Sequence, residues 1–154
     1  MRSLRFVNLC WLLLIVACGL LPGNNNLENE FCAEPRELIQ DFGHITLPAS
    51  YAQLEVRCSV FVDNHTVYAR FDFAPADLEA FQQSTLIDEW HDSSGTPPDF
   101  PYSFGTFLDE PGIARLPAYT YGLYTPQLPV SQQILIDTSN AQRLVVYFVA
   151  FTSY

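Results

Sequence analysis

Two neighbouring stretches of this chain alternate regularly between apolar and polar side chains. In residues 52–62 the even positions are apolar or Cys, and in residues 67–73 the odd positions are apolar. A period of two is that of a β-strand with one buried and one solvated face. Asp63 and Asn64 stand between the stretches, and both residue types tolerate the positive φ of a tight turn. The pattern therefore predicts an antiparallel hairpin.

A second hairpin is expected near the C-terminus. Residues 133–137 and 143–152 are rich in β-branched and aromatic side chains, and a Thr-Ser-Asn-Ala segment joins them. Residues 144–151 are apolar at odd and even positions alike, which is typical of a central strand covered on both faces. The last strand is therefore expected in the middle of the sheet.

Two short helices are expected beside these strands. One would begin at Pro35, because Pro is favoured at the first helical position, and would end at Phe42 before Gly43. Another would begin at Pro75, and acidic residues in its first turn would complement the helix dipole. The apolar stripe that could pack this second helix on the sheet consists of Leu78, Phe81 and Leu86.

The stretch from His91 to Pro129 contains seven of the eleven Pro residues. Pro removes backbone donors from strand ladders, so this stretch is expected to be mostly ordered loop, with one short strand near residues 119–124. The expected fold class is α+β. It would consist of a small, mostly antiparallel sheet of two hairpins, with one or two helices packed on it and a long loop rich in Pro and aromatic residues.

Residues 1–17 have the composition of an export signal. Arg2 and Arg5 precede an apolar run at 6–17 that only Asn8 interrupts. A membrane-spanning helix would need about twenty apolar residues, and this run is shorter. We therefore expect the leader to direct export and to be absent from the folded domain.

The end of the leader carries the sequence Ile15-Val16-Ala17-Cys18. It resembles the lipobox of bacterial lipoproteins, although Ile15 stands where Leu is commoner. The resemblance covers the leader alone. It implies cleavage before Cys18, a diacylglyceryl group on its thiol and often a fatty acyl group such as palmitate on the new amine. Several acyl chains hold a protein firmly on a membrane.

The composition after the leader predicts a division of the chain. Residues 18–30 would be a flexible tether, because positions 19–30 are rich in Gly, Pro and Asn, and residues 31–154 would form one domain. The lipobox resemblance implies that this domain lies outside the cytoplasm, anchored to the cell membrane or the outer membrane. Two alternatives remain open. One is ordinary cleavage, for instance after Gly19. The other is a secreted eukaryotic protein, in which Asn64-His65-Thr66 would be a glycosylation site.

If Cys10 leaves with the leader and Cys18 is lipidated, Cys32 and Cys58 remain as a pair. An even number of remaining Cys residues in an oxidising compartment favours one disulfide. Closing a loop of about 27 residues would contribute roughly 3.5 kcal/mol in the chain-entropy model. The alternative is that both Cys residues are metal ligands, but no second Cys or His lies nearby at ligand spacing.

The charge of the exported part limits its partners. Two of the seven Arg lie in the leader, so five Arg and no Lys remain against seventeen carboxylates. Such a surface repels phosphate backbones, and nucleic acid is therefore excluded as an expected partner. Cationic partners or divalent ions remain compatible with this charge.

No common catalytic, nucleotide-binding or metal-binding motif occurs, and no cofactor or metal is expected. The densest polar cluster is residues 88–92, where His91 stands among three carboxylates. It could bind a divalent cation or form an acid/base pair. Its spacing matches no ligand template, however, and a solvated acidic corner is the favoured interpretation.

The Pro- and aromatic-rich stretch is the best candidate for a recognition surface, because rigid rings with polar tips suit binding. Its rings could be exposed in one patch, or they could cap the sheet as a second core, which is the favoured alternative. The candidate binding residues are Phe100, Tyr102, Tyr119, Tyr121 and Tyr124.

The expected function is that of a non-catalytic binding or structural module of the cell envelope. Its partner would be an envelope protein or a glycan. The main alternative is a small envelope hydrolase that uses His91 with nearby carboxylates. A third is an acidic module that binds divalent cations.

Overall fold

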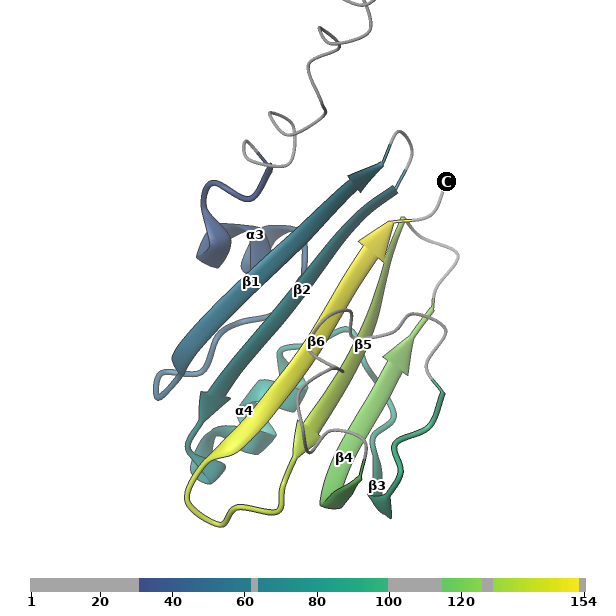
Figure 1. Ribbon diagram of the computed structural model, residues 1–154. Coiled ribbons are helices and arrows are strands. Elements are labelled where there is room, and N and C mark those ends of the chain that lie inside the picture. The colour runs from purple at the N-terminus through teal and green to yellow at the C-terminus, as the bar shows by residue number, and fades with distance from the viewer. Residues whose placement is uncertain (1–30, 62–63, 100–114, 126–128, 153–154) are drawn as a thin grey trace, which may run out of the picture.

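The computed structural model describes residues 31–61, 64–99, 115–125 and 129–152 (Figure 1). These residues form one antiparallel sheet of six strands, in the order β1-β2-β6-β5-β4-β3. The strands are β1 (Ala52–Phe61), β2 (Asn64–Phe73), β3 (His91–Gly95), β4 (Leu116–Tyr124), β5 (Val130–Asp137) and β6 (Leu144–Thr152). The helices are α3 (Pro35–Asp41), the 3₁₀ helix η1 (Pro75–Asp77) and α4 (Leu78–Gln83).

Both expected hairpins are confirmed. Strands β1 and β2 pair antiparallel from Phe61–Asn64 outward, and β5 pairs antiparallel with β6. Strand β6 also pairs with β2, so it lies inside the sheet as its two apolar faces predict. The two predicted helices are present as well, although Leu86 lies beyond the end of α4.

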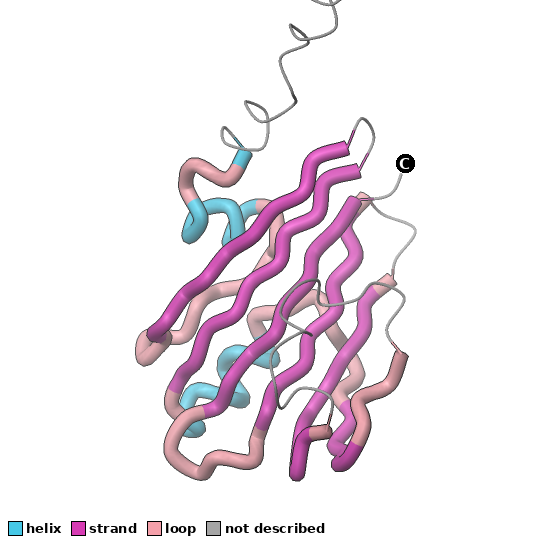
Figure 2. Tube along the Cα trace, viewed as in Figure 1, coloured by secondary structure: helices cyan, strands magenta, loops and turns pink. Residues whose placement is uncertain are grey.

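The sheet is larger than the two predicted hairpins, because β3 and β4 extend it beyond β5 (Figure 2). The expected strand at 119–124 is present and begins earlier, at Leu116. Strand β3 was predicted as irregular chain, and that prediction is wrong. Its sequence, His-Asp-Ser-Ser-Gly, has no apolar alternation, and β3 is a strand because it pairs along the edge of β4.

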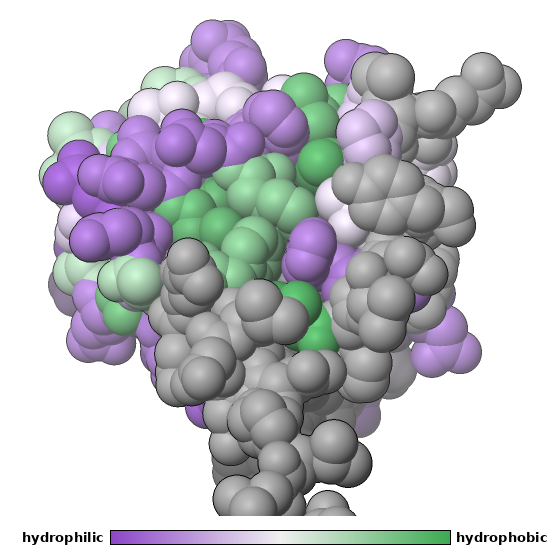
Figure 3. Space-filling model, turned by 90° about the horizontal axis from the view of Figure 1, so that it is seen from above, coloured by the Kyte–Doolittle hydropathy of each residue, from purple (hydrophilic) through white to green (hydrophobic). Residues whose placement is uncertain are grey.

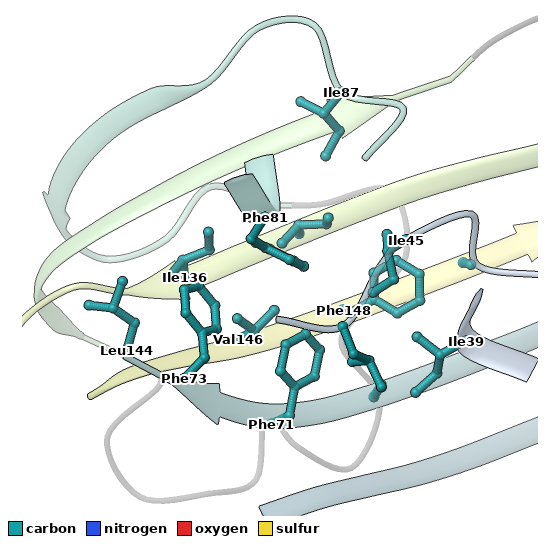
Figure 4. Close-up of a cluster of buried hydrophobic side chains, with 14 of the residues drawn as sticks. Ile39, Ile45, Phe71, Phe73, Phe81, Ile87, Ile136, Leu144, Val146 and Phe148 are labelled. Carbon is teal, nitrogen blue, oxygen red and sulfur yellow. The ribbon is translucent and has the colours of Figure 1, made fainter. Parts of the chain in front are cut away.

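One face of the sheet, the helix-covered face, packs against α3, α4 and the segments that follow them (Figures 1 and 4). Phe71 of β2 contacts Phe81 of α4 edge-to-face at 5.7 Å between ring centroids. Gly43 ends the α3 turn where a side chain would collide with the ring of Phe148. The fully or almost fully buried core of this face includes Ile39, Ile45, Phe71, Phe73, Phe81, Ile134, Ile136, Val146 and Phe148.

The opposite face, here called the tyrosine face, carries a second buried cluster. Its rings include Tyr119 of β4 and Tyr147 of β6, and Tyr68 and Tyr121 pack against them while remaining partly exposed. The other buried members of this cluster are Leu116, Leu135, Val149 and Phe151. Strands β5 and β6 therefore bury side chains on both faces. In the part of the chain that the structure describes, no helix is long and apolar enough to cross a membrane.

Candidate functional site: an apolar cavity at one end of the sheet

A cavity of about 310 Å³ lies on the helix-covered side, where β4 ends and β5 begins. Its lining residues are His44, Leu86, Tyr124, Pro129 and Val130. Figure 3 looks onto this end of the molecule and shows apolar surface near its centre, with hydrophilic residues above it and to its left in the view. The cavity walls thus come from the segments after the two helices and from the ends of two neighbouring strands.

The buried side-chain amide of Gln132 on β5 hydrogen-bonds the two segments that follow α3 and α4. Gln132 is fully buried, and its Nε2 donates to the carbonyl oxygens of Gly43 and, at 3.4 Å, of His44. Its Oε1 accepts from the backbone N–H of Leu86 at 3.0 Å. An amide can donate and accept at once, so one side chain satisfies backbone groups from both segments.

The backbone at His44 has an unusual conformation. Its φ is 51°, in the left-handed region that residues with a side chain seldom adopt. The turn places the carbonyl groups of Gly43 and His44 within reach of Gln132. Such strained positions tend to occur at binding sites, and this one lies in the cavity wall.

The lining is mostly apolar and offers two polar side chains. Leu86, Pro129 and Val130 provide hydrocarbon surface, while His44 carries an imidazole and Tyr124 a phenol. Tyr124 pairs directly with Gln132 across β4 and β5, so its backbone lies beside the buried amide. A largely apolar cavity with a few polar groups is the usual form of a small-molecule site, in which the polar groups fix orientation.

The structure divides the predicted aromatic surface. Tyr119 is almost fully buried and donates from its hydroxyl to the carbonyl oxygen of Thr96 at 3.1 Å. Tyr121 is half-buried beside His91, with 5.2 Å between ring centroids. Both belong to the tyrosine face, whereas Tyr124 lines the cavity on the other face.

The alternative of one exposed patch does not hold for these three rings together, because odd and even positions of one strand face opposite ways. Tyr119 and Tyr121 fit the alternative of a second core. Phe100 and Tyr102 lie outside the described residues. The role of these residues in binding stays a prediction.

The charged side chains of residues 88–92 do not converge on one point, because His91 and Asp92 have different neighbours. The Nε2 of His91 lies 3.8 Å from Glu89 Oε1, and both side chains are well exposed. Asp92 Oδ1 instead accepts from the hydroxyl of Thr120 at 2.5 Å. Within residues 31–61, 64–99, 115–125 and 129–152, no three His, Cys, Asp or Glu side chains are placed to hold a metal ion.

The two Cys residues expected to pair lie at disulfide distance. Cys32, just before α3, and Cys58, on β1, have their Cα atoms 6.2 Å apart, within the usual range for a disulfide. The pair joins the start of the helical layer to the edge of the sheet. Cys18 lies outside the described residues.

Comparison of the chain with protein-family models, with curated proteins and with solved structures found no match.

Most of the cavity could not have been found from local sequence patterns, because its residues come from three separate parts of the chain. Tyr124 was among the predicted binding residues; His44, Leu86, Pro129 and Val130 were not. One signal was present in the sequence. Gln132 lies on the same face of β5 as Ile134 and Ile136, at a position where a buried apolar residue would be expected.

Proposed function

We propose that this chain is an exported, lipid-anchored protein whose domain binds a small apolar molecule in the cavity at the end of the sheet. The observation that carries the proposal is the cavity itself, whose walls Gln132 ties to β5. Its volume of about 310 Å³ is at the lower end of ligand sites, which suits a ligand the size of one or two rings. The imidazole of His44 or the phenol of Tyr124 would receive the ligand's polar group.

The lipid anchor is supported by the leader and by the Ile15-Val16-Ala17-Cys18 sequence. Cys32 and Cys58 at disulfide distance agree with a compartment in which disulfides persist. An acidic domain would be repelled by anionic lipid headgroups, so acyl chains on Cys18 would supply the attachment to the cell membrane or outer membrane.

Binding is favoured over hydrolysis by the chemistry of the lining. A hydrolase needs a nucleophile or general base with an orienting partner beside the substrate. The five lining residues offer one imidazole, one phenol and hydrocarbon. The histidine of the predicted hydrolase, His91, instead contacts Tyr121 of the tyrosine face.

The anchor is tested by the intact mass of protein extracted from membranes. The expected first residue is Cys18, carrying a diacylglyceryl group, and Cys18→Ala should release the protein from the membrane fraction if its leader is still cleaved. A soluble mature form that begins at Leu20 would contradict the anchor.

The cavity is tested by calorimetric titration of the mature protein with indole, a small apolar probe with one hydrogen-bond donor. Wild type should bind it saturably, and Leu86→Trp should abolish binding because the larger ring fills the cavity. Leu123→Trp is the matched control, since Leu123 is 43% exposed on the tyrosine face of β4. Equal binding by the two variants would refute the site.

A further inference from the structure

Strand β1 lies at one end of the strand order and pairs with β2 alone. Among the described residues, no strand lies along its outer side. In an antiparallel ladder the hydrogen-bonding groups of alternate residues face away from the neighbour, so this edge can accept another strand. At the other end of the sheet, β3 has only five residues, and its pairing with β4 is irregular between Ser93 and Gly95.

The charged side chains of β1 are complementary to a second copy of themselves. Glu55 and Arg57 lie on one face of the strand, on either side of Val56, and each is about half exposed. Within the single chain Arg57 donates to Glu55 Oε1 from Nη2 at 2.5 Å and from Nε at 3.1 Å, and self-pairing would exchange these partners between the two copies. If two β1 strands pair antiparallel around Val56, Glu55 of each copy stands opposite Arg57 of the other. Registers centred on Glu55 or on Arg57 would instead place like charges directly opposite.

The other face of β1 favours the same register. Leu54 and Val56 are partly buried against the core of the helix-covered face, and self-pairing would place Val56 against Val56 of the second copy and Leu54 against Cys58. The pairing would end near Gln53, whose φ of 53° bends the strand, so residues 54–58 would form the contact. Cys58 lies at disulfide distance from Cys32 of its own chain, and the proposed pairing requires no disulfide between the copies.

We propose that two copies of this chain associate through β1 and form one continuous antiparallel sheet. The two-fold axis of such a pair is perpendicular to the sheet, so both copies present their helix-covered face, with α3, on the same side. If the anchor proposed above is correct, this arrangement lets both copies attach to one membrane. Confinement to that membrane would favour a contact of this small size. The pairing itself does not depend on the anchor or on the cavity.

Charge reversal tests the register. The mature protein would be studied by analytical ultracentrifugation in a density-matched detergent, over a series of protein concentrations. Wild type should form dimers. Glu55→Arg and Arg57→Glu should each weaken the dimer by about tenfold in its dissociation constant, because both contacts become like-charged. The double variant with both changes should regain wild-type association.

A mixture of the two single variants gives a sharper result. One copy then carries two Arg and the other two carboxylates, so a mixed dimer should form although neither variant dimerises well alone. Glu79→Arg, the same charge change on exposed α4, is the matched control and should leave dimerisation unchanged. Circular dichroism would verify that each variant is folded.

Several outcomes would overturn the proposal. They are a wild-type protein that stays monomeric over the whole series, single variants that dimerise as well as wild type, and no gain on mixing. A stable complex with a mass other than twice that of the chain would mean that a different strand occupies this edge, and it too would overturn self-pairing.

Discussion

The two faces of the sheet are built from the same strands but from different chemistry. The helix-covered face is packed with hydrocarbon, in which Phe71, Phe73, Phe81 and Phe148 are buried. The tyrosine face pairs its apolar residues with rings that carry hydroxyl groups, and the guanidinium of Arg70 lies 6.0 Å from the ring of Tyr147. The difference indicates that the helix-covered face holds the fold together and that its cavity is a break in that packing. Truncating a buried side chain should therefore lower the free energy of unfolding more on the helix-covered face than on the tyrosine face.

The largest effect is expected from Phe148→Ala. This ring is fully buried between β6 and the α3 turn, and its loss should lower the free energy of unfolding by about 3–5 kcal/mol. Tyr121→Ala, on the tyrosine face, removes a half-buried ring and should cost about 1 kcal/mol. Urea unfolding of both variants measures the contrast. Equal losses would show that the two faces contribute alike.

Cys58→Ser should follow in size. The pair with Cys32 connects the helical layer to β1, and removing a disulfide from a small domain costs about 2–5 kcal/mol. Ser59→Ala, at the next position and on the other face of β1, should change stability little. If reductant leaves wild-type stability unchanged and Cys58→Ser is as stable as wild type, the two thiols are not bonded in solution.

Substitutions at Gln132 and Gln133 compare the two faces of the sheet at neighbouring positions of β5. Gln132→Leu leaves the carbonyl of Gly43 and the N–H of Leu86 without their buried partner, which should cost about 2 kcal/mol and loosen the cavity walls. Gln133→Leu alters an equally buried amide on the tyrosine face. It should lower stability but leave indole binding intact, whereas Gln132→Leu should weaken both. Indole titration and urea unfolding distinguish these results.

The smallest effect concerns an ion pair at the margin of the tyrosine face. Arg143 donates to Asp72 through Nη2 at 2.9 Å and Nε at 3.0 Å, and these hydrogen bonds lower the pKa of Asp72. A carboxyl with a lowered folded-state pKa stabilises the protein above its ordinary pKa, here 3.8, and loses that contribution as the pH falls through the lowered value.

Asp72→Asn should therefore destabilise the protein at pH 6, and the difference from wild type should shrink as the solution is acidified below pH 3.8. Urea unfolding at a series of pH values measures it. A difference that stays constant with pH would mean that the ion pair contributes nothing.

The sequence was sufficient to predict the elements whose periodicity is local. The hairpin of β1 and β2, the central place of β6 and the helices that begin at Pro35 and Pro75 all follow from patterns within a few residues. Strand β3 could not be predicted, because its polar residues become a strand only through pairing with β4. The division of Tyr121 and Tyr124 between two faces could have been predicted only if the strand had been recognised to its full length.

The cavity required the tertiary structure for a similar reason. His44, Leu86 and Val130 are far apart in the chain. The side-chain amide of Gln132 on β5 hydrogen-bonds the backbone of His44 and of Leu86, and so holds both residues near Val130. A polar residue at a core position of a strand was the one local sign of it. Such a residue indicates that a buried backbone group elsewhere needs a partner, but it does not say where that group lies.

The proposed function is tested most directly by a crystal structure of the mature protein with bound indole. Density for the ring is expected between Leu86, Val130 and Tyr124, with the indole N–H directed at a polar group of the wall and Gln132 still bonded to both segments. The proposed binding function is contradicted if the cavity remains free of indole at saturating concentration, or if the ring binds only on the tyrosine face.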